Sequence, residues 1–274
     1  MTAFPGPAAV PARWPSSSFA AQAATLTWRQ LRTAVRDPQE ILFGLLQPTV
    51  LLFLFTQVFA ILTTTAAFPP GLSYVDYLMP AILLNNALQQ AMQSGVALVE
   101  DLDNGFLARL RSMPVHPLVP LVARSFAGLG FCALQLVVML GIAIALFGHR
   151  PGGSPAGVLA SLLLALVVSW GVGWPFLALG AWLRRAQTMQ NVSVVAVFPL
   201  MFISSAYVPI SALPGWTHTL AQLNPLTYAV DTMRTLALGI PGGGLGAAGL
   251  TVGICVVLAV VGALAALPGF RRPL

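Results

Sequence analysis

The sequence predicts an all-α integral membrane protein with six transmembrane helices and both termini in the cytoplasm. Three observations carry this prediction: six apolar runs could each cross a bilayer, charged residues are scarce, and the arginines lie almost entirely in alternate loops. An N-terminal amphipathic interface helix and short re-entrant outer helices between spans five and six complete the predicted fold. We expect residues 1–20 to form a disordered cytoplasmic tail and residues 21–274 to form one transmembrane domain.

The composition excludes a soluble globular domain. Hydrophobic residues make up 57% of the 274 residues and charged residues only 7%, whereas soluble domains carry about 25% charged residues. The net charge of +6 comes from arginine, because the chain has no lysine. These arginines border the apolar runs, so we interpret the charge as a mark of membrane topology and not of nucleic-acid binding.

Each predicted span is an apolar run of about 20 residues or more, the length that a helix needs to cross the hydrocarbon core. The third run is long enough to tilt or to extend beyond the lipid. The N-terminal tail lacks the apolar core of a signal peptide. The six runs are residues 41–62, 75–99, 118–147, 156–183, 189–208 and 246–267.

Arginine counts orient the chain, because cytoplasmic loops of membrane proteins are enriched in Lys and Arg. Eleven arginines fall on one side of the predicted membrane, and only Arg150 and Arg234 fall on the other. An odd number of spans would break this alternation, which supports six. The abundance of Ala, Gly, Pro and Arg is typical of a GC-rich bacterial genome. We therefore expect the chain in the bacterial inner membrane.

Residues 21–36 predict an amphipathic helix at the cytoplasmic surface of the membrane. Four apolar residues recur at helical spacing and share one face: Ala24, Trp28, Leu31 and Val35. Charged residues form an adjacent stripe: Arg29, Arg32 and Arg36. Because such arginines extend toward lipid headgroups, we expect membrane lipids to contact this helix. Pro38 then separates it from the first span.

The predicted cytoplasmic loop of residues 100–117 opens with acidic residues, turns at Asn104-Gly105 and closes with two prolines. A short helix that ends in prolines suits a rigid docking element, and an ordinary solvated loop explains the pattern equally well. The residues that would serve docking are Glu100, Asp101, Gly105, Leu110, Arg111 and Pro114.

The outer stretch of residues 209–244 predicts two short helices that dip into the outer leaflet. Asn224 can cap the second helix, Pro225 suits its first position, and Gly239 can end it. At about 14 residues this helix is too short to span the bilayer. Asp231 and Arg234 lie three residues apart and can form an ion pair, which either serves function or only stabilises the helix.

Span two carries a stripe of side-chain amides. Asn85, Gln89 and Gln93 share a face, and Asn86 and Gln90 lie beside it. A lipid-facing position would be costly, so these residues face protein or a water-filled cavity. They either line a pathway or hydrogen-bond between helices; five amides on one side favour the pathway.

Polar and small residues mark the last two spans less strongly. In span five, Asn191 is a further candidate for the pathway. In span six, Gly249 and Gly253 have the small-xxx-small spacing that allows close helix packing, more plausibly within the chain than between two copies.

Several kinds of chemistry are absent from the sequence. Without lysine the chain cannot form a P-loop for ATP. The three histidines lie in loops on both sides of the membrane and cannot converge on one metal, and Cys132 and Cys255 are small apolar residues within apolar runs. No ionisable residue sits in the middle of a span, which argues against a proton-driven carrier and against an intramembrane enzyme. We expect no catalytic residue, metal or cofactor on this chain.

Three segments resemble one transporter family. The loop segment 104–115 reads Asn-Gly-Phe-Leu-Ala-Arg-Leu-Arg-Ser-Met-Pro-Val and is followed by Arg124. It is similar to the signature loop of type-2 ABC exporter permeases. Segment 204–209 (Ser-Ser-Ala-Tyr-Val-Pro) and the segment from Asn224 to Gly239 are similar to the daunorubicin-resistance branch. The resemblance covers residues 26–270, and many relatives carry more charge before Gly105.

The resemblance implies a division of labour. A separate P-loop ATPase subunit would bind ATP and Mg, and would contact the N-terminal helix and the loop of residues 100–117. A second permease copy, identical or related, would complete the path, with spans one, two and five lining the cleft. The implied function is outward transport of a hydrophobic drug, antibiotic or lipid-like molecule. Polysaccharide or glycolipid export is the nearest alternative, although few aromatic residues line the expected path, and a standalone channel or carrier is another.

Overall fold

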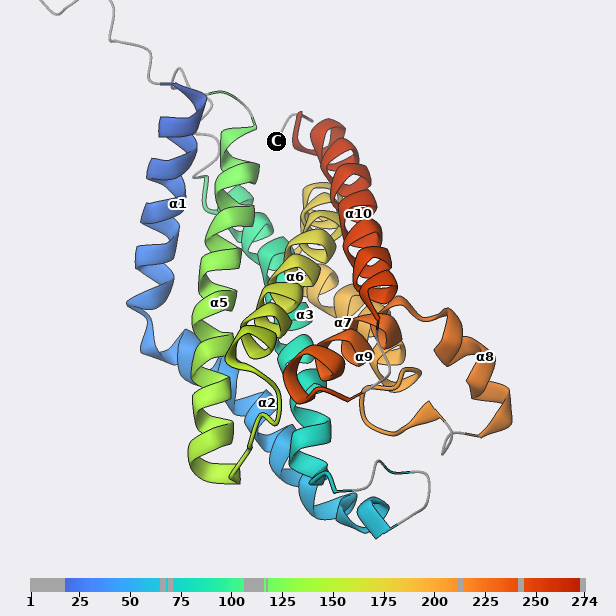
Figure 1. The fold of residues 1–274 in the computed structure, drawn as a ribbon. Coiled ribbons are helices and arrows are strands. Elements are labelled where there is room, and N and C mark those ends of the chain that lie inside the picture. Colours follow the sequence, from blue (N-terminus) through green and yellow to red (C-terminus); the bar gives the residue numbers. More distant parts are fainter. Residues whose placement is uncertain are drawn as a thin grey trace, which may run out of the picture.

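The structure is a computed structural model that describes residues 18–64, 68, 71–105, 116, 118–210, 214–240 and 244–271. These residues form helices and no strands (Figure 1). The helices are α1 (Phe19–Val35), α2 (Pro38–Val58), a 3-10 helix η1 (Ala60–Thr64), α3 (Tyr74–Asp103), α5 (Val119–Phe147), α6 (Pro155–Leu183), α7 (Ala186–Phe202), α8 (Gly215–Leu223), α9 (Pro225–Leu238) and α10 (Leu245–Arg271).

Four helices of the described chain are long and apolar enough to cross a membrane: α2, α5, α6 and most of α10. These correspond to predicted spans one, three, four and six. The second predicted span is α3, whose 30 residues suffice in length but whose amides lower its hydropathy. The fifth is α7, which has 17 residues and ends at Phe202, six residues before the predicted end. The count of six spans and the orientation of the termini therefore stay predictions.

Helix α3 is the centre of the fold and is buried along most of its length. It packs against α6 through glycines that let two backbones approach closely. A Cβ on Gly95 would lie 2.5 Å from the carbonyl oxygen of Phe176, and one on Gly180 would lie 2.6 Å from that of Gly95. Since real Cβ atoms do not come this close, larger residues would separate the two helices.

Helix α10 packs against α6 through Gly262, where a Cβ would lie 2.5 Å from the backbone of Trp174. The expectation that Gly249 and Gly253 pack within the chain is wrong for the part that the structure describes, because no described atom lies within 4 Å of a Cβ built on either residue. The spacing identified small residues correctly but not the side of α10 that faces α6.

Helix α1 lies beside the first half of α5 (Figure 1). The Thr27 hydroxyl donates to the carbonyl of Ala123 at 3.4 Å, and Leu31 packs against Gly130. Of the predicted apolar face, only Leu31 is turned to the protein; Ala24, Trp28 and Val35 are exposed. The helix thus has two apolar sides, because residues between the predicted ones, such as Leu26, face α5.

Local capping explains where several helices begin. Asp37 caps α2 by accepting hydrogen bonds from the backbone N–H groups of Gln39 and Glu40 at 2.9 and 3.3 Å. Pro38 occupies the first turn, where its missing N–H costs nothing. The proline predicted as a break between α1 and the first span is therefore also the start of that span.

Candidate functional site

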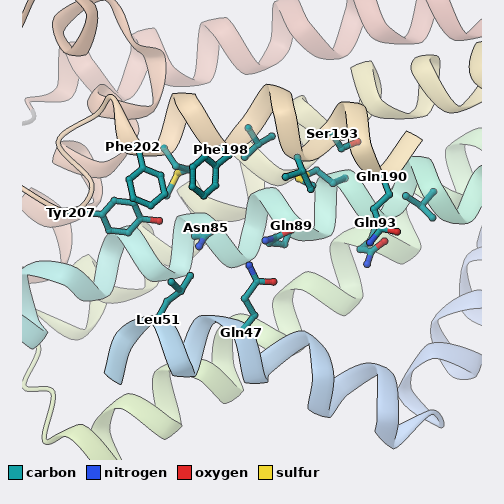
Figure 2. A pocket seen from close by; sticks show the side chains of 15 residues that line it. Gln47, Leu51, Asn85, Gln89, Gln93, Gln190, Ser193, Phe198, Phe202 and Tyr207 are labelled. Atoms are coloured by element: carbon teal, nitrogen blue, oxygen red, sulfur yellow. The ribbon is translucent and has the colours of Figure 1, made fainter. Parts of the chain in front are cut away.

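A cavity of about 270 Å³ lies between α2, α3 and α7, the three helices predicted to line the cleft. Figure 2 shows α3 in the middle with Asn85 and Gln89 directed at the cavity, and Gln47 of α2 reaching toward them. Helix α7 forms the opposite wall. The polar lining comes from six side chains: Gln47, Asn85, Gln89, Gln93, Gln190 and Ser193.

One end of this cavity is aromatic. Phe198 and Phe202 of α7 lie beside Tyr207 in the turn that follows (Figure 2). The ring centres of Phe202 and Tyr207 are 5.0 Å apart, and the ring centre of Phe55 of α2 lies 4.7 Å from that of Tyr207. The expectation that few aromatic residues line the path does not describe this end, where Phe198, Phe202 and Tyr207 all line the cavity.

The five amides of α3 divide between the two roles that the sequence left open. Asn85, Gln89 and Gln93 line the cavity. Gln90 donates from Nε2 to Oε1 of Gln135 on α5 at 2.7 Å, which is the interhelical hydrogen bond of the alternative interpretation. Asn86 is 1% exposed, and its Oδ1 has no hydrogen-bond partner among the described residues. The stripe therefore both lines a cavity and ties α3 to α5.

In α7 the structure places the neighbours of Asn191 at the cavity and not Asn191 itself. Its Oδ1 accepts from Gln187 Nε2 at 3.1 Å on an exposed side of the same helix. Gln190 and Ser193 line the cavity. Sequence reasoning also missed Gln47, although a lone amide in an apolar span is the same signal that identified the stripe in span two.

The docking residues are only partly described. Leu110, Arg111 and Pro114 lie outside the described residues. Gly105 has φ +67°, in the left-handed region that glycine tolerates, so the predicted turn at Asn104-Gly105 is present. Glu100 is exposed at the end of α3.

Asp101 faces inward and pairs with Arg124 at 3.8 Å. Burial raises the pKa of Asp101, while the charges of Arg124 and Arg29 oppose the rise. This ion pair joins the start of the docking loop to α5, and Arg29 brings α1 into the same charge cluster. The other charged residues of the α1 stripe, Arg32 and Arg36, are exposed, as is Trp28.

Helix α9 contains a buried arginine with several polar partners. Arg234 of α9 is 5% exposed. It donates to the carbonyls of Tyr77 on α3 at 3.0 Å and Ala206 at 2.7 Å, and to Asp231 at 3.1 Å. Its guanidinium also lies 3.6 Å from the ring centre of Tyr77. The predicted pair with Asp231 is present, but Arg234 additionally joins α9 to α3 and to the turn after α7.

At the N-terminal end of α9, Asn224 likewise forms hydrogen bonds that join this helix to other elements. Its Oδ1 accepts from the N–H of Leu226 at 3.0 Å, which is the predicted cap, and Pro225 opens the helix. Its Nδ2 donates at 2.6 Å to the carbonyls of Leu200 and Ile203, at the end of α7. Gly239 ends α9 with φ +72°. The N-cap residue of α9 therefore donates hydrogen bonds to backbone carbonyls at the C-terminal end of α7, which have no partner within that helix.

Comparison with known proteins identifies the family of this chain. The family model "ABC-2 type transporter" matches residues 21–238. The chain is 27% identical over 227 residues to the daunorubicin resistance ABC transporter permease protein DrrB1 of Streptomyces coeruleorubidus, covering 81% of this chain and 77% of that protein.

Two further relatives extend the comparison. A probable doxorubicin resistance ABC transporter permease protein, DrrC, of Mycobacterium tuberculosis is 29% identical over 272 residues, covering 96% of this chain and 94% of that protein. A putative transport permease, ycf38, of Porphyra purpurea is 29% identical over 199 residues, covering 73% of this chain and 68% of that protein. The family match covers most of the chain, so this protein is a multi-pass membrane permease that belongs to the ABC-2 type transporter family.

Proposed function

We propose that this chain is the membrane-spanning subunit of an ATP-driven exporter in the bacterial inner membrane, with both termini in the cytoplasm. It moves a hydrophobic drug, antibiotic or lipid-like molecule outward through the groove between α2, α3 and α7. The observation that carries the proposal is the amide-lined cavity between these helices. A purely structural bundle has little reason to keep six polar side chains around one apolar-walled space.

The surroundings of the cavity support a second permease copy as partner. Apolar side chains are exposed on both helices that form its walls, including Phe43 and Phe53 of α2 and Val195 and Phe198 of α7. Lipid could cover these residues, but a second copy would cover them and close the groove at once. ATP and Mg would bind to a separate ATPase subunit, since ABC-2 permeases normally work with one and this chain has no lysine for a P-loop.

Polysaccharide or glycolipid export is the second candidate. The aromatic end of the cavity favours it, because Phe202 and Tyr207 offer faces on which sugar rings could stack. The relatives named for daunorubicin and doxorubicin resistance favour a drug-like substrate.

Purification of the tagged chain from native membranes in mild detergent tests the proposal. A P-loop ATPase is expected to co-purify in stoichiometric amount, and transport is expected to require ATP. A chain that repeatedly purifies alone and well folded would instead support the standalone channel or carrier.

The same preparation tests the docking surface. Arg111→Glu is expected to reduce recovery of the ATPase at unchanged expression, because it reverses a charge on the predicted contact loop. The matched control is Arg150→Glu, on the predicted outer side. Full ATP-coupled transport by a well-expressed Arg111→Glu variant would contradict the docking role.

A further inference from the structure

Polar side chains join α3 to α5 at three levels: near the start of α3, in its middle and near its end. The pairs are Asp76 with His149, Gln90 with Gln135, and Asp101 with Arg124, at 2.7, 2.7 and 3.8 Å. Because these contacts are spread over most of the length of both helices, they oppose rotation and separation of one helix against the other. Helices α3 and α5 therefore form one unit.

Other helices are joined to their neighbours by hydrogen bonds as well. Arg234 joins α9 to the backbone of α3, and Asn224 joins α9 to the end of α7. Trp182 of α6 donates to the carbonyl of Ala265 on α10 at 2.8 Å. The groove wall formed by α7 is thus attached at one end to the rest of the bundle.

Helix α2, the remaining wall of the groove, is attached much more weakly. Among the described residues it forms no ion pair and no hydrogen bond to a nitrogen or oxygen of another helix. Its one polar contact of this kind joins the Thr49 hydroxyl to the sulfur of Met139 at 3.6 Å. Only three of its 21 residues are buried: Leu45, Pro48 and Leu52. Little therefore opposes displacement of α2 relative to α3 and α5.

The backbone of α2 can bend at two places. At Asp37 the chain is extended, with φ −95° and ψ 97°, and turns sharply from α1 into α2 (Figure 1). Helix α1 before this bend is joined to α5, since the Thr27 hydroxyl donates to the carbonyl of Ala123. Within α2, Pro48 cannot donate to the carbonyl of Gly44 four residues earlier, which weakens that turn of the helix.

We propose that α2 is the moving wall of the groove and swings about the bend at Asp37, while α1, α3 and α5 keep their positions relative to one another. The swing changes the separation of Gln47 on α2 from Gln89 on α3, and with it the width of the cavity that both line. Its role in transport rests on the proposed export function. The inference adds which helix of this chain opens and closes the groove.

Distances between paired spin labels test the motion without any need for transport. The chain, with Cys132 and Cys255 replaced, is placed in nanodiscs together with excess unlabelled chain, so that each particle holds one labelled copy. One pair is Leu46→Cys on α2 with Val137→Cys on α5, both at exposed positions. The matched control keeps the α5 label and uses Trp28→Cys on α1, before the bend. We expect the α2 pair to give a distance distribution about twice as wide, because only α2 swings.

Reversible crosslinks test whether transport needs this motion. Thr49→Cys with Met139→Cys joins α2 to α5, whereas Asp76→Cys with His149→Cys replaces an existing contact between α3 and α5 by a covalent one. The same short thiol-specific crosslinker is applied to vesicles that hold the chain and its ATPase. ATP-dependent uptake of doxorubicin is the measurement. We expect the first crosslink to lower uptake about tenfold until it is reduced, and the second to change uptake less than about twofold.

Three results would overturn the inference: equal widths for the two label pairs, full uptake with α2 crosslinked to α5, or equal loss of uptake from both crosslinks. A chain that co-purifies with an ATPase and yet gives equal widths would remain an exporter subunit without this moving wall. A wide distribution for α2 in a chain that repeatedly purifies alone would keep the moving wall and contradict the proposed function instead.

Discussion

At the scale of single residues, the ion pair between Arg234 and Asp231 either stabilises only helix α9 or holds several elements together. The size of its contribution to the free energy of unfolding distinguishes these two interpretations. A pair three residues apart on a helix surface contributes about 0.2–0.5 kcal/mol. Arg234 is buried, however, and serves two carbonyls and a ring in addition to Asp231. Removal of one partner from a buried charged network costs about 3–5 kcal/mol, because the remaining groups lose their partner away from water.

We therefore expect Arg234→Met to lower the free energy of unfolding by about 3 kcal/mol. The measurement is the unfolding midpoint of the purified chain in detergent. Arg150→Met removes an exposed arginine and serves as the control. A loss of 0.5 kcal/mol or less, as estimated for a surface pair, would mean that the pair only stabilises α9.

Asp101 leads to a prediction about pH. Burial raises its pKa above the ordinary value of 3.8, so the folded chain holds this proton more tightly than the unfolded chain. Its contribution to stability is greatest at low pH and declines as pH rises from 3.8 through the folded pKa.

Asp101→Asn is expected to remove this component of the decline, as measured by unfolding midpoints across the acidic range. Asp103→Asn, at an exposed position, should keep the wild-type profile. An unchanged profile in Asp101→Asn would show that its carboxylate is solvated.

At the scale of elements, the rotation of α7 decides which of its polar residues can reach the groove. Met189, Ser193, Val197 and Met201 recur every four residues and form its buried stripe, and Gln190 beside it lines the cavity. Asn191 follows one position later and is exposed. Since each residue turns an α-helix by about 100°, a single position separates a lining residue from a non-lining one.

This rotation predicts different effects of two neighbouring substitutions. Gln190→Leu is expected to change the transport rate of individual substrates by about threefold, as estimated for one lost hydrogen bond in a membrane protein. Gln89→Leu, on the facing helix, should act similarly. Asn191→Leu is the control with the wild-type profile. ATP-dependent uptake of several substrates into inverted vesicles is the measurement. Equal effects at 190 and 191 would refute the role of the cavity.

At the scale of the whole molecule, the arginine distribution and the helix lengths bear on how many times the chain crosses the bilayer. The arginine distribution predicts six spans, and α3 and α7 are the two that do not meet a simple test of length and hydropathy. Both border the cavity, and the polar groups that suit them to line it are those that weaken the span signal in α3.

Cysteine labelling tests this threading. Cys132 and Cys255 are buried and can be replaced to give a background without reactive thiols. A membrane-impermeant maleimide is expected to label Arg150→Cys in intact cells, and Arg185→Cys only after permeabilisation. Labelling of Arg185→Cys in intact cells would contradict the six-span topology.

Much of the fold could be predicted because it depends on near neighbours in the sequence. The all-helical fold follows from apolar runs and their lengths. The start of α9 at Asn224-Pro225 and its end at Gly239 follow from capping within one turn. These features need no knowledge of which helices touch, so the sequence by itself determined them, as it did the family resemblance.

Only the tertiary structure decided which side chains share a space. Gln47 and Gln190 line the cavity, whereas Asn86 and Asn191 do not. Arg234 donates hydrogen bonds to carbonyls that are 157 and 28 residues away in the chain. Helix α1 turns Leu31 toward α5 and Trp28 away from it. Each outcome depends on the rotation and crossing of packed helices. Packing sets that rotation over the whole interface, and periodicity within one helix does not record it.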